Sequence, residues 1–225
     1  MLAATVMSRE RCMAALFALG SVCFVVAPFP GFAQLVGAQA DALTFFVGSL
    51  FFTGGGALQA AIAFPERRSR TGQAAWRAAA IQVAGTLFFN ITTYQAVHTS
   101  LSDADYNRVV WRPDAFGSAC FLISGVVAYR ASARHGWRPA RGSAGWWEPA
   151  LNLLGCGFFG IAAVAGYVVP ATGTPLDLAA ANVNTVLGAA CFLACAVATL
   201  RTGRTLKSPR LRRLRAMRRR RSARA

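Results

Sequence analysis

The feature that most limits the folds open to this chain is an uncharged run of 22 residues, Leu43 to Phe64. An α-helix rises about 1.5 Å per residue, so a helix of this length is about 33 Å long. That length crosses the hydrocarbon core of a bilayer, which is about 30 Å thick. The run therefore predicts a transmembrane helix. Its polar side chains are only Thr44, Ser49, Thr53 and Gln59.

A five-residue pattern lies at the centre of this run and reads Gly48-Ser49-Leu50-Phe51-Phe52. A glycine, usually with a second small residue, is followed at the fifth position by phenylalanine, and the pattern recurs once in each of five other apolar segments. Small residues let transmembrane helices approach closely. We therefore predict that the pattern packs helices together, through Gly20, Gly48, Ser49, Gly85, Gly117, Ser118, Gly155 and Gly188.

Six helices are predicted, one for each copy of the pattern. The chain is 55% hydrophobic and 14% charged, whereas soluble domains carry about a quarter charged residues. We expect an all-α fold, a polytopic transmembrane helical bundle. Its predicted helices span residues 12–36, 43–64, 76–97, 115–129, 149–169 and 178–200.

The first segment has a second interpretation. Residues 1–33 also fit a cleavable signal peptide, because a short basic start precedes an apolar core from Cys12 to Ala27. The segment carries its own copy of the pattern, which favours a retained helix.

An internal repeat is predicted from a shift of about 70 residues, which lays Trp76 on Trp146, Gln82 on Asn152 and Gly85 on Gly155. Such a period indicates a duplicated two-helix hairpin followed by a lone sixth helix. The expected units are the N-terminus with the first helix (1–42), two hairpins (43–113 and 114–177), the sixth helix (178–200) and a basic tail (201–225).

A family resemblance lies in the same residues. The phrases FFVGSLFF (residues 45–52) and FGSACFL (residues 116–122) resemble the signature of YrhK-like bacterial membrane domains. Those domains are small two-helix modules with no established activity. The resemblance covers residues 43–200 as tandem units and departs from the signature at Ala189, where the signature has serine. It implies hairpin units and assigns no catalytic residue.

The positions of the basic residues predict the topology. The N-terminus, the loops after the second and fourth helices, and the tail hold two, four, four and twelve basic residues when Arg77, at the start of the third helix, is counted with the loop before it. The other three loops hold zero, two and zero. The positive-inside rule then places both termini in the cytoplasm, with the chain in the cell (inner) membrane. Five acids are expected in the outer loops: Asp41, Asp103, Asp105, Asp114 and Asp177.

The tail is predicted to contact anionic lipids of the inner leaflet. Leu211, Leu214 and Met217 recur at three-residue spacing among the arginines. This is typical of a cationic helix lying on the membrane, or of a disordered tail held there electrostatically. Nucleic acid is not expected as a partner, since the tail has no aromatic side chains. The predicted lipid contacts are Arg210, Arg212, Arg213, Arg215, Arg218 and Arg219.

No catalytic, cofactor or metal site is predicted. The six cysteines form no C-x-x-C pair, and Cys191 and Cys195, although on one helix face, are interpreted as small apolar packing residues. His98 and His135 fall in loops on opposite sides of the membrane. Arg77 and Arg130 are expected at the inner boundary of the membrane and no charged residue within its interior, so the usual marker of an ion pathway is missing from the sequence.

Uncharged polar residues leave two functions open. Interhelical hydrogen bonds between them are worth about 0.6 kcal/mol each and would suit a non-catalytic membrane module with a packing or partner-binding role, its partner a second copy or another membrane protein. A shared cavity would instead suit a small polar-solute transporter or channel. The candidate cavity residues are Gln82, Asn90, Thr93, Asn152 and Asn182.

The predicted topology can be tested by thiol labelling in intact cells. A membrane-impermeant reagent should reach the introduced cysteine in Asp103→Cys but not in Arg138→Cys, because the two loops lie on opposite sides. Labelling of both positions from outside would contradict the six-span topology.

Overall fold

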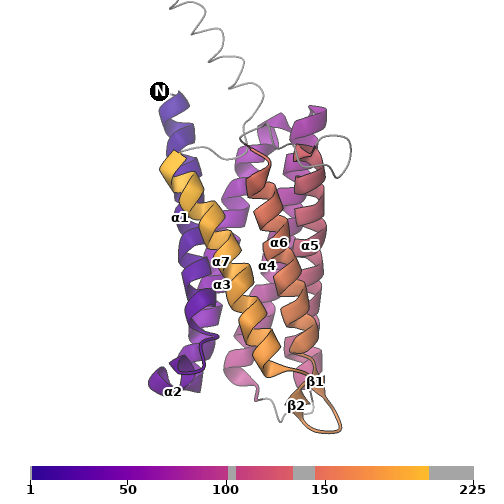
Figure 1. Ribbon diagram of the computed structural model, residues 1–225. Coiled ribbons are helices and arrows are strands. Elements are labelled where there is room, and N and C mark those ends of the chain that lie inside the picture. The colour runs from indigo at the N-terminus through magenta and orange to yellow at the C-terminus, as the bar shows by residue number, and fades with distance from the viewer. Residues whose placement is uncertain (1, 101–104, 134–144, 203–225) are drawn as a thin grey trace, which may run out of the picture.

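The structure is a computed structural model in which residues 2–100, 105–133 and 145–202 are described. Six long α-helices dominate this part of the chain (Figure 1). They are α1 (Leu2–Val26), α3 (Ala38–Ala63), α4 (Arg70–His98), α5 (Arg112–Ser132), α6 (Trp147–Ala165) and α7 (Leu178–Thr202). The shorter elements are α2 (Phe32–Val36), a 3-10 turn η1 (Phe64–Glu66), a π-helical turn η2 (Asn107–Trp111), β1 (Val168–Val169) and β2 (Thr174–Pro175).

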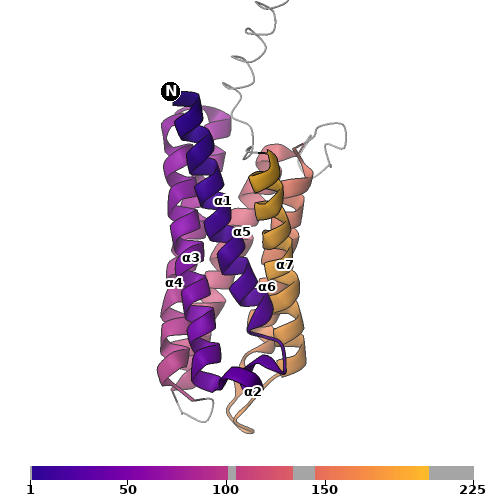
Figure 2. The same ribbon diagram turned by 90° about the vertical axis from the view of Figure 1, so that its left-hand side faces the viewer.

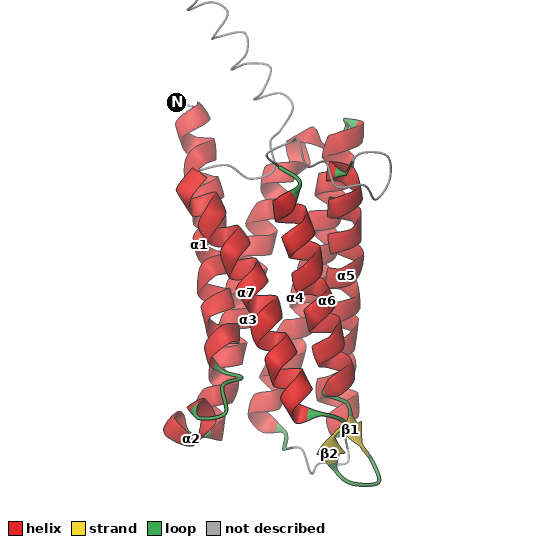
Figure 3. Ribbon diagram, in the orientation of Figure 1, coloured by secondary structure: helices red, strands yellow, loops and turns green. Residues whose placement is uncertain are grey.

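The long helices stand side by side in a closed ring. Helices α1, α4 and α6 run in one direction and α3, α5 and α7 in the other (Figures 1 and 2). Each long helix packs against its neighbour along the chain, and α1 packs against α7 to complete the ring. The prediction of an all-helical fold is confirmed. Figure 3 shows a single small exception, the antiparallel pair in which Val168 is opposite Pro175 and Val169 opposite Thr174.

The final phenylalanines of the six patterns meet at the centre of the ring. Each of these side chains is at least 94% buried. Their rings contact one another edge-on, tilted or stacked, with centroids 4.9–6.3 Å apart. The second residue of each pattern is buried beside them. The six core phenylalanines are Phe24, Phe52, Phe89, Phe121, Phe159 and Phe192.

The glycines of the pattern make room for these rings in reciprocal pairs. Between α4 and α5, Gly85 faces the ring of Phe121 and Gly117 faces the ring of Phe89. The same exchange joins α1 to α3, and α6 to α7. A Cβ atom at Gly48 would lie 2.7 Å from the Cβ of Cys23, closer than two carbon atoms approach. Glycine is therefore required for these crossings. The remaining pairs are Gly20 with Phe52, Gly48 with Phe24, Gly155 with Phe192, and Gly188 with Phe159.

These contacts group the helices differently from the predicted hairpin units. The units join α3 with α4 and α5 with α6, whereas the reciprocal contacts join α1 with α3, α4 with α5, and α6 with α7. Both groupings are neighbours in the ring. The two-helix repeat and its boundaries therefore stay a prediction.

Four of the described helical segments are long and apolar enough to cross a membrane: Ala38–Glu66, Asn107–Ser132, Trp147–Ala165 and Leu178–Arg201. Helices α1 and α4 are not among them. Helix α1 carries Arg9, Glu10 and Arg11 in its first half, and α4 carries the amides Gln82, Asn90 and Gln95.

Five of the six long helices begin earlier than the sequence predicts, and at α3 and α5 this places two acids differently. Helix α3 begins at Ala38, so Asp41 lies in its first turn, where a carboxylate interacts favourably with the helix dipole. Helix α5 follows η2 without interruption, since Pro113 is tolerated in its first turn. Asp114 is therefore helical as well. Both residues were expected in loops.

The close crossings predict opposite effects of two glycine substitutions. A Cβ atom at Gly85 would lie 2.6 Å from the buried ring of Phe121, so Gly85→Ala should destabilise the fold by about 1–3 kcal/mol. Gly157 has no atom within 4 Å of the corresponding position. Gly157→Ala should leave stability unchanged or raise it by up to about 1 kcal/mol through helix propensity. Thermal unfolding of both variants in detergent measures the difference, and equal stabilities would contradict the close-crossing account.

Candidate functional site

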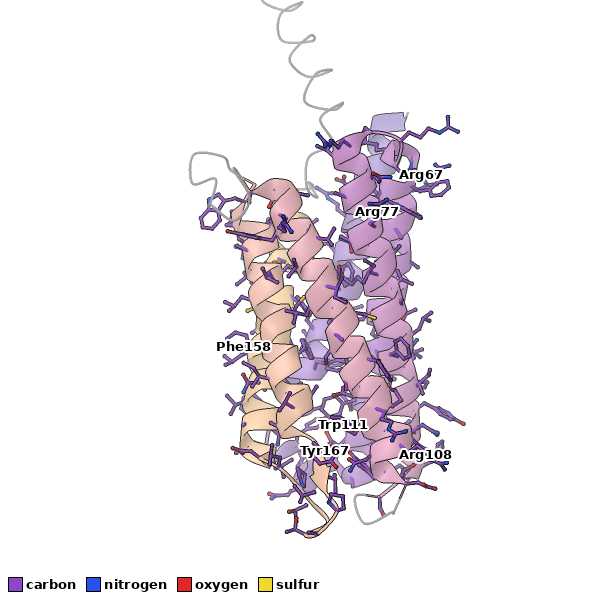
Figure 4. The ribbon with its side chains drawn as sticks, turned by 90° about the vertical axis from the view of Figure 1, so that its right-hand side faces the viewer. Arg67, Arg77, Arg108, Trp111, Phe158 and Tyr167 are labelled. Atoms are coloured by element: carbon purple, nitrogen blue, oxygen red, sulfur yellow. The ribbon has the colours of Figure 1, made fainter. Side chains whose placement is uncertain are left out.

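A cavity of about 300 Å³ enters one end of the ring. Residues of η2 and of all six long helices line it. It lies at the end that carries Arg108, opposite the end that carries Arg67 and Arg77 (Figure 4). The cavity occupies space that α1 leaves free. Helix α1 ends at Val26, just past Phe24, whereas α4 continues from Phe89 to His98.

The floor of the cavity is aromatic. Phe24, Phe89 and Phe159 line it, one from each of the three helices that run toward this end. The other three core phenylalanines do not line the cavity but contact the floor from behind. The ring centroids of Phe89 and Phe121 are 4.9 Å apart, and those of Phe159 and Phe192 are 5.5 Å apart. The cavity therefore stops at two layers of phenylalanine rings.

Two threonines on the wall are already hydrogen-bonded within the protein. The Oγ1 of Thr92 donates to the carbonyl oxygen of Val110 in η2. The Oγ1 of Thr93 donates to the carbonyl oxygen of Phe89 and lies 3.0 Å from the Oγ of Ser49. These hydroxyl groups join α4 to η2 and to α3. A ligand could therefore only donate a hydrogen bond to their remaining oxygen lone pairs.

The carboxyl groups of Asp41 and Asp114 also line the cavity. The Oδ1 atom of Asp41 is buried and has no hydrogen-bond partner. In the described part of the chain, no hydrogen bond or ion pair joins either carboxylate to another side chain. Arg108, at the same end, is exposed and pairs instead with Asp105, at 2.9 Å. In the described ranges, the Oδ1 atom of Asp41 is thus an acceptor beside the cavity without a hydrogen-bond partner.

The π-helical turn fixes one wall. Trp111 donates from Nε1 to the carbonyl oxygen of Ala163 at 2.8 Å, and its ring meets that of Tyr167 edge-on at 4.9 Å (Figure 4). Asn107 binds the backbone of Val168 twice, donating from Nδ2 at 2.6 Å and accepting at Oδ1 at 3.1 Å. These contacts join η2 to α6 and the β-hairpin. The π-turn is a local irregularity of the kind often found at functional sites.

Tyr106 lies on the cavity wall just before η2. Burial raises the pKa of its phenol, and the nearby Asp114 carboxylate raises it further. The phenol therefore remains a neutral hydrogen-bond donor well above physiological pH.

Of the five polar residues predicted to share a cavity, only Thr93 lines this one. The amide of Asn90 contacts the Oγ1 of Thr53 at 2.9 Å, between α4 and α3. Gln82 is buried within the bundle, and Asn152 donates to the Sγ of Cys156 at 3.8 Å in its own helix. Asn182 is half-buried on α7. Sequence reasoning missed Asp41 and Asp114. The stretch QADAL around Asp41 has no helix breaker, and this signal could have extended the helix to include it.

Among the described residues, the other groups considered from the sequence do not form a ligand-binding arrangement. In the described ranges, no group of three or more His, Cys, Asp or Glu side chains could hold a metal ion. The Sγ of Cys195 donates to the carbonyl oxygen of Glu148 at 3.5 Å. The predicted lipid-contacting arginines of the tail, residues 210–219, lie outside the described residues.

No family model matches the chain, and no curated protein or solved structure matches it. The site must therefore be interpreted from its own geometry.

The proximity of Tyr106 to Asp114 predicts a measurable coupling. Asp114→Asn should lower the pKa of Tyr106, because a neighbouring negative charge disfavours the tyrosinate. The pKa should stay above the ordinary value of about 10, because burial, the larger cause, remains. Ultraviolet absorbance of tyrosinate, compared with a Tyr106→Phe variant, isolates this titration. An unchanged pKa would contradict the proximity of the two groups.

Proposed function

We propose that this chain is a six-span inner-membrane protein that binds a small solute, without catalysis, in the cavity at its outer end. The four candidate spans support the membrane location directly. The two remaining long helices complete the same ring and contribute to the same phenylalanine core.

The outer surface of the ring supports all six spans. Every long helix exposes a large apolar side chain close to its copy of the pattern, and each of these is 42–54% exposed. A continuous apolar belt is unfavourable in water and favourable in a bilayer. Phe158 shows this outward position at mid-height in Figure 4. The belt includes Leu19, Leu50, Leu87, Ile123, Leu154 and Leu187.

The proposed orientation has the cavity facing outward. Arg67, which follows η1, and Arg77, near the start of α4, lie at the end opposite the cavity (Figure 4). By the positive-inside rule that end faces the cytoplasm, together with both termini. The solute then reaches the cavity from the outer side.

The proposed function rests on how far the cavity extends into the ring and on the phenylalanine floor at which it ends. It passes from the end of the ring to Phe24, Phe89 and Phe159, and a second phenylalanine layer lies behind them. A closed aromatic floor suits binding, whereas conduction would need a continuous polar path. The lining combines apolar surface with a few polar groups, which is the usual composition of small-molecule sites.

Transport of the solute is the second candidate, and η2 favours it. A π-helical turn on the cavity wall gives α5 a point at which the helix can change register. Such a shift would move Trp111 and Val110 relative to the floor.

The remaining partner predictions accompany this proposal as further proposals. They are a second copy or another membrane protein as partner, anionic lipids bound by the tail, and the YrhK-like relationship. None of them is needed for the cavity to bind a solute.

Thiol labelling within α4 tests the outward cavity. Ala96 lines the cavity, whereas Ala79, in the same helix, is 1% exposed and lies away from it. A small membrane-impermeant thiol reagent should modify Ala96→Cys in intact cells and leave Ala79→Cys unmodified, as measured by mass spectrometry of the α4 peptide. Protection of Ala96→Cys in a folded protein would contradict an open cavity. Labelling only in inside-out vesicles would reverse the orientation.

A further inference from the structure

The two carboxylates on the cavity wall indicate the charge of its ligand. Asp41 comes from α3 and Asp114 from α5, so two separate helices bring acids to one space. Both acids are partly buried, and a carboxylate that loses part of its hydration is stabilised by a positive partner or by hydrogen-bond donors. Among the described residues neither carboxylate has a basic partner, and Arg108 is engaged with Asp105.

The buried Oδ1 of Asp41 strengthens this point. The atom has no hydrogen-bond partner, yet its side chain lines the cavity. Buried polar atoms without partners are uncommon in native proteins, and each needs an explanation. Oδ1 itself is enclosed by protein atoms, so a cation held in the cavity would stabilise this carboxylate through its charge.

The aromatic lining indicates the kind of cation. Phe24, Phe45, Phe89, Phe159 and Trp111 all face the cavity. Aromatic faces attract organic cations through the ring quadrupole, and quaternary ammonium groups are recognised in this way. A Ca²⁺ ion would instead need six to eight oxygen ligands, and a Mg²⁺ ion a compact octahedral set. Two carboxylates surrounded by rings do not provide that.

The size of the cavity limits the ligand. A volume of about 300 Å³ is near the lower end of the range for small-molecule pockets. It has room for a compact ammonium compound with a few carbon substituents. The substituents would rest on the phenylalanine floor, and the charge would lie toward the two acids.

We propose that the cavity binds a small organic ammonium ion, its charge held by Asp41 and Asp114 and its apolar groups by the aromatic floor. This inference rests on the proposed solute-binding function and names the class of solute. Tyr106 adds a hydroxyl group on the same wall, which can hydrogen-bond a polar substituent.

The experiment compares choline with its neutral carbon isostere, in which carbon replaces the ammonium nitrogen. Binding of each to the purified full chain in detergent micelles is measured by calorimetry, with sodium chloride at equal ionic strength as the reference. Choline should bind at least about tenfold more tightly than the isostere, because the isostere leaves both carboxylates without a positive partner. A tenfold difference corresponds to about 1.4 kcal/mol.

Three variants separate the carboxylates from general electrostatics. Asp41→Asn and Asp114→Asn should each weaken choline binding by about tenfold or more and leave binding of the isostere nearly unchanged. Asp105→Asn is the matched control, because Asp105 is exposed at the same end and does not line the cavity. It should not change choline binding. If the asparagine variants fail to fold, the comparison of the two probes on the unaltered chain still tests whether the cavity prefers a cation.

The possible outcomes distinguish the ammonium inference from the proposed solute-binding function on which it rests. Equal binding of choline and the isostere, both lost when Ala96 is replaced by tryptophan, would overturn the ammonium proposal and keep the solute-binding cavity. Absence of binding by either probe, together with an unlabelled Ala96→Cys, would overturn the proposed function itself. Loss of choline binding in Asp105→Asn as great as in Asp114→Asn would show that surface charge, not the cavity, attracts the cation.

Discussion

The close approach of neighbouring backbones at the patterned glycines is the interaction on which the rest of this structure depends. At Gly155 a Cβ atom would lie 3.1 Å from the backbone oxygen of Gly188, and at Gly188 one would lie 3.0 Å from the oxygen of Gly155. Only glycine permits both approaches. The space that each glycine leaves is filled by a phenylalanine of the partner helix. Association of this kind relies on dispersion and shape, which remain available in a lipid environment where the hydrophobic effect between helices does not.

The same arrangement explains why the cavity lies at one end and not at mid-height. Six large rings fill the centre of the bundle, so empty space can persist only where a helix stops short. Pro28 and Pro30 follow the end of α1 at Val26, and proline lacks the amide hydrogen that would continue the helix. Helices α4 and α6 continue past the level of their own core phenylalanines, so the missing turns of α1 leave room beside them.

Much of this architecture could be predicted from the sequence, because its determinants are local. The glycine–phenylalanine pattern predicts packing at Gly48 and Gly117, and both lie at close crossings. The cavity could not be predicted, because its lining comes from residues far apart in the chain. Asn90 and Thr93 are only three residues apart in α4, yet Asn90 turns to Thr53 and Thr93 faces the cavity. The π-turn could not be predicted from the sequence either. Its extra residue is accommodated by the hydrogen bonds from Trp111 to Ala163 and from Asn107 to Val168.

The closure of the ring between α1 and α7 has a consequence for biosynthesis. Of the six long helices, α1 is synthesised first and α7 last, and these two helices are neighbours in the folded protein. Phe24 and Phe52 can pair as soon as α3 is made, but Phe159 and Phe192, which they also contact, arrive with the final two helices. Until α6 and α7 are made, the inner face of α1 therefore lacks these partners. The ring closes when α7 packs against α1.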